Sequence, residues 1–139
     1  MPSHKLSVII PAYHQAKSIA RDVKRIDKSL SGIRYPYEII VVVDGYGDGT
    51  YQAIKKIPLP SHIKATVYMK NQGKGYAVSY GMKRATGDYV AFIDSGMEID
   101  PNGISMLLEH MEWYNADIIV ASKRHPVSVV HYPLNRKIL

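Results

Sequence analysis

Short apolar runs rich in β-branched residues alternate with amphipathic helical patterns along most of this chain. The predicted strands cover residues 5–10, 38–43, 63–69, 89–93 and 117–121. The predicted helices between them cover residues 18–30, 48–57, 75–85 and 102–113. Strands that alternate with helices over short connections form a mostly parallel sheet with helices on both faces. We therefore predict one doubly wound α/β domain over residues 1–139.

Composition limits the class of protein further. The chain has 139 residues, of which 46% are hydrophobic and 22% are charged, as is typical of a globular domain with one core. It contains no cysteine, so disulfides and thiolate metal sites are excluded, and its six histidines show no metal-ligand spacing. No apolar run approaches the roughly 18 residues of a membrane span, and we expect a cytoplasmic location. The net charge of +6 favours an anionic partner.

Polar residues follow the first two strands, at the carboxyl ends where ligands bind in open α/β sheets. Pro11 opens the first loop, in which Tyr13 and Gln15 offer a ring and an amide that suit a nucleobase. A turn with a packed tyrosine explains the same residues equally well. In the second loop Asp44 is placed to accept a hydrogen bond from a base, whereas Asp48 or Thr50 suits a helix cap.

The next two loops carry charge. Glycines surround Lys74 just before a helix, which predicts an anion site without the spacing of a Walker A or dinucleotide motif. The run 90–93 ends in Asp94, followed by Glu98 and Asp100. Carboxylates at a strand tip suit a divalent cation that is bridged to substrate phosphates. The alternative is that Glu98 and Asp100 are solvated acids, with Asp100 at the start of a helix.

Four segments carry a longer pattern. They are VIIPAY at 8–13, VVDGYGDGT at 42–50, the block from NQGKGYA at 71–77 to ATGDY at 85–89, and ASK at 121–123 continuing to Arg136. In this order and spacing they resemble the family 2 glycosyltransferases with a GT-A fold. The branch that they resemble most is the polyprenyl-phosphate sugar synthases, such as the dolichyl-phosphate mannosyl- and glucosyltransferases. The resemblance covers nearly the whole chain.

The resemblance implies an enzyme that moves a sugar from a UDP- or GDP-sugar to a polyprenyl (dolichyl-type) phosphate, using Mg²⁺ or Mn²⁺ at the cytosolic face of a membrane. With the predicted anion site at Lys74, the expected donor-binding residues are Pro11, Tyr13, Gln15, Val42, Asp44, Lys74, Asp94 and Ser95. Asp94 and Glu98 are the expected metal ligands. Asp94, Lys123 and Arg136 are the expected catalytic residues, and the two bases suit diphosphate or lipid-phosphate oxygens.

Two features depart from the family pattern. Gly96 stands where the second acid of an Asp-x-Asp motif is expected, so Glu98 and Asp100 would have to compensate. The sequence ends at Leu139, about where the acceptor-binding half is expected to begin. A non-catalytic or truncated nucleotide-sugar-binding module is therefore the main alternative.

A basic α/β protein that binds nucleic acid is a third possibility. Basic residues alternate with acids along the helices, as on solvated faces, and no RNA-binding signature is present. We accordingly predict no nucleic-acid partner. The sequence carries no signal for the oligomeric state.

Overall fold

The computed structural model describes residues 4–95 and 103–121. The elements follow in the order β1 (Leu6–Ala12), α1 (Ile19–Leu30), β2 (Tyr37–Val43), α2 (Thr50–Lys55), β3 (Ile63–Val67), α3 (Lys74–Met82), β4 (Tyr89–Phe92) and α4 (Gly103–Trp113). The chain divides into two compact units, residues 1–105 and 106–139. The sheet and the first three helices all belong to the first unit.

The four strands form one parallel sheet with the order β3-β2-β1-β4. Ile9 marks the register, because it pairs with Ile40 of β2 on one side and with Phe92 of β4 on the other. All seven residues of β1 are buried, which is why this strand has an apolar run instead of an alternating pattern. The parallel order brings the carboxyl ends of all four strands to one edge, as predicted.

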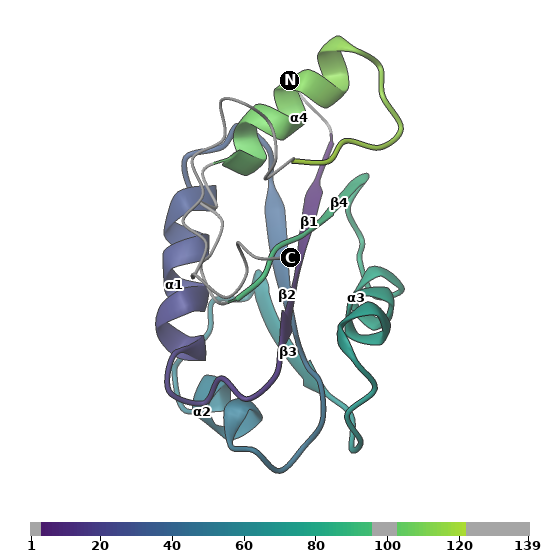
Figure 1. The fold of residues 1–139 in the computed structure, drawn as a ribbon. Helices are drawn as coiled ribbons and strands as arrows, with labels where there is room; N and C mark the ends of the chain where they lie inside the picture. The colour runs from purple at the N-terminus through teal and green to yellow at the C-terminus, as the bar shows by residue number, and fades with distance from the viewer. Residues whose placement is uncertain (1–3, 96–102, 122–139) are drawn as a thin grey trace, which may run out of the picture. The chain divides into compact units, whose positions relative to one another are not determined.

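Helices cover both faces of the sheet: α1 and α2 lie on one side and α3 on the other (Figure 1). On the α3 side, Ala77 packs against Ile9, Ile40 and Val42. A Cβ added to Gly81 would lie 2.5 Å from Ile9 Cγ2, so the absence of a side chain lets α3 approach the sheet closely.

The sequence of α1 explains its packing. Four apolar residues recur at helical spacing and are almost fully buried: Ile19, Val23, Ile26 and Leu30. Burying each such side chain contributes about 1.5–3 kcal/mol. The helix ends where predicted, and the Ser31 N–H bonds to the Asp27 carbonyl oxygen at its carboxyl end.

The predicted strand at 117–121 is wrong. Residues 118–121 have no regular structure, and Ile118 and Val120 are 80% and 78% exposed. β-branched residues favour a strand only where a partner strand supplies backbone hydrogen bonds, so their presence in this run does not by itself make a strand. In the described part of the chain, no helix is long and apolar enough to cross a bilayer.

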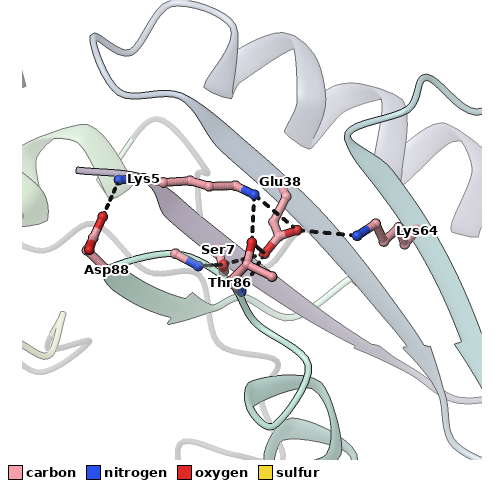
Figure 2. A network of polar contacts seen from close by, with 7 residues as sticks. Lys5, Ser7, Glu38, Lys64, Thr86 and Asp88 are labelled. Carbon is pink, nitrogen blue, oxygen red and sulfur yellow. Dashed lines mark hydrogen bonds and ion pairs between the residues drawn. The ribbon is translucent and has the colours of Figure 1, made fainter. Parts of the chain in front are cut away.

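A polar network joins the strands at the edge opposite their carboxyl ends (Figure 2). Glu38, almost fully buried, accepts hydrogen bonds on Oε1 from the Ser7 hydroxyl at 2.7 Å and from the Thr86 N–H and hydroxyl, each at 2.8 Å. The ammonium groups of Lys5 and Lys64 lie 3.4 and 3.8 Å from its Oε2. Burial alone would raise the pKa of Glu38, but these hydrogen bonds, helped by Lys5, lower it to about 2. The network thus holds Thr86, which lies just before β4, against β1 and β2.

Candidate functional site

The loop after β1 is bonded to the loop after β2. Asp48 accepts the His14 N–H on Oδ2 and the Thr50 N–H on Oδ1, both at 2.8 Å. The Gln15 N–H donates to the Thr50 hydroxyl oxygen at 3.0 Å. Burial alone would raise the pKa of Asp48, but the Thr50 and His14 bonds outweigh it and lower the pKa. The N-cap of α2 is Gly49, without a side-chain cap bond, so the prediction that Asp48 or Thr50 is the cap is wrong; Asp48, one position earlier, nevertheless accepts the first N–H of the helix, that of Thr50.

Asp44 bonds the loop after β2 to the loop after β3. Its Oδ1 accepts the Tyr68 hydroxyl at 2.6 Å and the Gln72 N–H at 2.7 Å, and its Oδ2 accepts the Asn71 amide at 2.7 Å and the Gly73 N–H at 3.0 Å. Burial and the bond to Asp44 raise the pKa of Tyr68. A carboxylate has about four acceptor sites, so Asp44 has none left for a base in this arrangement. Its contact with a nucleotide stays a prediction that needs one of these donors to leave.

Lys74 and Asp94 join the loop after β3 to the tip of β4. The Lys74 ammonium lies 2.5 Å from Asp94 Oδ1 and 5.7 Å from the centre of the Phe92 ring. The Lys74 side chain is 56% exposed and the Asp94 side chain 34% exposed. A soluble ligand at this edge therefore meets an ammonium and a carboxylate that already neutralise each other.

Ser95 joins the tip of β4 back to the first loop. Its hydroxyl, which is buried, contacts Gln15 Oε1 and lies 3.2 Å from the Pro11 carbonyl oxygen. The β1–β4 pairing ends at Ile9, so Pro11 faces the space just beyond the end of β4. That position also explains how β1 accommodates a proline, since the missing N–H removes no bond to β4. The four loops are thus linked in a closed ring.

The predicted donor-binding residues fall into two groups. Tyr13 is 49% exposed, and Gln15, Lys74 and Asp94 are also accessible. Pro11, Val42, Asp44 and Ser95 are buried. Strand alternation points the Val42 side chain into the core beside Ala77, so the structure does not support a side-chain contact between Val42 and a ligand. Glu98, Lys123 and Arg136 lie outside the described residues, as do Gly96 and Asp100.

Residues 4–95 and 103–121 offer a divalent cation few side-chain ligands. These residues contain no group of three or more His, Cys, Asp or Glu side chains that is suited to a metal ion. One carboxylate is enough for a Mg²⁺ that is held mainly by water and phosphate oxygens, and Asp94 fits that requirement. A cation that binds Oδ1 of Asp94 would nevertheless have to displace the Lys74 ammonium from that oxygen.

Sequence reasoning missed the partners of Asp44. Tyr68 and Asn71 lie 24 and 27 positions further along the chain, and nothing in their local sequence marks them as its hydrogen-bond donors. The available signal is the acid itself, because a carboxylate that directly follows six buried strand residues needs donors from neighbouring loops. The role of Thr50 as an acceptor for the Gln15 N–H was missed for the same reason.

Comparison with known proteins adds the family. Residues 7–137 match the model of glycosyl transferase family 2. The chain belongs to this family. This family 2 chain is also similar to a dolichol-phosphate mannosyltransferase from Pyrococcus furiosus. The two sequences are 31% identical over 136 residues, which is 97% of this chain. The chain spans 38% of the length of that relative.

Solved structures resemble this family 2 chain as well. The mannosyltransferase PcManGT from Pyrobaculum calidifontis, in complex with GDP-Man and Mn²⁺, matches 76% of this chain and 32% of its own with a TM-score of 0.62 at 20% identity. S. aureus TarS 1–349 in complex with UDP matches 90% of this chain and 38% of its own, also with a TM-score of 0.62, at 24% identity. Likenesses at this identity concern the fold, and they confirm the predicted GT-A architecture.

Proposed function

We propose that this family 2 chain binds a nucleoside-diphosphate sugar on the ring of four loops and transfers its sugar to a polyprenyl phosphate. One observation carries the proposal: contacts between the loops bring Tyr13, Gln15, Lys74 and Asp94 to one edge of the sheet with accessible side chains. Those residues offer an aromatic ring, an amide, a cation and an acid, which are the groups that a base, a ribose and a diphosphate need.

The relatives support the kind of donor and acceptor. One neighbour of the same fold was solved with GDP-Man and Mn²⁺ and another with UDP, which favours a guanine or uracil nucleotide. The name of the Pyrococcus relative specifies dolichol phosphate. A lipid acceptor would place the chain at a membrane surface, where its net charge of +6 is attracted to anionic head groups. We propose peripheral association with the cytosolic face.

The residues of the chain suggest how transfer proceeds. Tyr13 stacks on the base, and the Lys74 ammonium lies near the diphosphate. We also propose that Lys123 and Arg136, which were expected from the family resemblance, neutralise phosphate oxygens of donor and acceptor. A bound Mg²⁺ or Mn²⁺, with Asp94 and Glu98 as its proposed ligands, supplies further stabilisation of the departing diphosphate. The acceptor phosphate is already an anion when its oxygen attacks the anomeric carbon, so a strong protein base is not needed.

A module that binds the donor without turnover is the second candidate. It is favoured by Gly96, which removes a carboxylate from the predicted metal site, and by the pairing of Asp94 with Lys74. Both candidates require nucleotide binding at the same edge. They differ only in whether sugar reaches an acceptor.

Two measurements test these proposals. Calorimetry with UDP and GDP, with and without Mn²⁺, should show nucleotide binding, and Asp94→Asn should reduce the gain in affinity that Mn²⁺ gives, because it removes a proposed metal ligand. The matched control is Asp88→Asn. It makes the same change at an exposed acid that directly precedes β4, at the end of the strand opposite Asp94. If neither nucleotide binds under either condition, both candidates fail. Transfer of a labelled sugar to a short polyprenyl phosphate separates the enzyme from the binding module.

A further inference from the structure

The Lys74 ammonium occupies Oδ1 of Asp94, one of the two carboxylate oxygens that a divalent cation could use. Its Nζ lies 2.5 Å from Asp94 Oδ1, at direct ion-pair distance, and no room for an ion remains between the two atoms. The pair is partly exposed, so a soluble cation can compete for the carboxylate. Lys74 and the cation are therefore in competition for one oxygen ligand.

We propose that Lys74 and a divalent cation are alternative partners of Asp94, and that Lys74 provides the charge for the donor diphosphate when no metal is bound. This inference rests on the proposed function. It makes Lys74 the residue that sets how strongly nucleotide binding depends on metal. With a metal on Asp94, the freed ammonium remains available to the same diphosphate.

The charges at the tip of β4 support this assignment. Asp94 carries one negative charge and Lys74 one positive charge, and Gly96 adds none where the family pattern expects an acid. Within the described residues 4–95, a diphosphate that approaches this tip meets the Lys74–Asp94 pair, whose two charges cancel. Removing the ammonium would leave the Asp94 carboxylate facing the diphosphate, and like charges repel.

The structure also allows Lys74 to change partners without moving its backbone. Lys74 is the first residue of α3, and that helix is held at both ends, by the Gly73 N–H on Asp44 and by the close packing of Gly81 on Ile9. The four-carbon side chain is half exposed and reaches past the Phe92 ring. A flexible side chain on a fixed helix can exchange a carboxylate for a phosphate by rotation about its own bonds.

The first test uses Mn²⁺ alone, with free Mn²⁺ followed by electron paramagnetic resonance. Lys74→Met removes the charge and keeps the length of the side chain, and it should tighten Mn²⁺ binding roughly threefold, as expected for removal of an exposed competing ion pair. Lys74→Arg keeps the charge and should bind Mn²⁺ as the parent does. Lys83→Met makes the same change at an exposed lysine just after α3 and is the matched control.

The second test uses calorimetry with UDP and GDP in the absence of metal. Lys74→Met should weaken nucleotide binding about tenfold, because it removes a charge-assisted contact and exposes the carboxylate. Lys83→Met should leave the affinity within about twofold of the parent, since exposed charges away from a site contribute little. Added Mn²⁺ should then raise the nucleotide affinity of Lys74→Met by a larger factor than it raises that of the parent.

Each arm has an outcome that overturns the inference. Equal Mn²⁺ affinity of Lys74→Met and the parent, or no Mn²⁺ binding by any variant, refutes the competition. Equal loss of nucleotide affinity in Lys74→Met and Lys83→Met refutes the contact with the diphosphate. If the parent binds neither nucleotide, the proposed function fails instead, and the Mn²⁺ arm still decides whether Lys74 and metal compete.

Discussion

The Tyr68 hydroxyl donates a 2.6 Å hydrogen bond to Asp44 Oδ1, and this bond links the end of β3 to the tip of β2. Tyr68 also packs edge-on against the rings of Tyr76 and Tyr80 in α3. One carboxylate and one tyrosine therefore connect two strands, a loop and a helix at the edge where the donor is proposed to bind.

Asp44→Asn should lower the free energy of unfolding by about 2–3 kcal/mol, because an amide group would meet N–H donors that a carboxylate accepts. Tyr68→Phe removes one donor and should cost about 1 kcal/mol. Urea unfolding measures both values. Hydrogen exchange should show faster exchange of the Gln72 and Gly73 amides in Asp44→Asn than in Tyr68→Phe. Equal protection of these amides in the two variants would contradict the loop-holding role of Asp44.

Glu38 should make stability depend on acid pH. Its pKa is about 2 in the folded chain against 4.5 in the unfolded chain, so its stabilising contribution is complete above pH 4.5 and is lost as the pH falls toward 2. The contribution is about 3 kcal/mol at neutral pH. The difference in unfolding free energy between the parent and Glu38→Gln should therefore shrink between pH 6 and pH 3. A difference that stays constant over this range would refute the assignment.

Two glycines of α3 should respond in opposite directions to the same substitution. Gly81→Ala should cost about 1–3 kcal/mol, because the added Cβ would lie 2.5 Å from Ile9 Cγ2 and 3.0 Å from Val42 Cγ2. Gly75→Ala should stabilise by about 0.5 kcal/mol, since a Cβ there meets no atom within 4 Å and alanine favours a helix. Thermal unfolding compares the two variants. A stabilised Gly81→Ala would show that α3 does not pack so closely on the sheet.

Gly96→Asp should make nucleotide binding more dependent on metal, because it restores a carboxylate where the family pattern has one. We expect Mn²⁺ to bind about tenfold more tightly, as for one added charged ligand. Gly96→Asn adds nearly the same volume without charge and is the matched control. Calorimetry with nucleotide, at several Mn²⁺ concentrations, measures the dependence. An unchanged dependence would mean that Glu98 or Asp100 already supplies the ligand, or that no metal binds.

The sequence by itself determined the elements whose signals are local. Helix α1 follows from four apolar residues at helical spacing, and β1 to β4 follow from short apolar runs bounded by turn residues. Because parallel strands end at one edge, the sequence also placed the four loops together. The strand prediction for residues 117–121 was wrong because a strand depends on a partner strand, which local propensity does not specify.

The tertiary structure alone decided which of the predicted site residues are available to a ligand. Asp44 is occupied by donors from 24 to 29 positions away, and the Ser95 hydroxyl reaches Pro11 across 84 positions. Such partners depend on how strands and helices pack, so a motif identifies Asp44 or Ser95 without showing that it is buried. The pairing of Lys74 with Asp94 is the same kind of fact: two residues chosen separately from the sequence proved to neutralise each other.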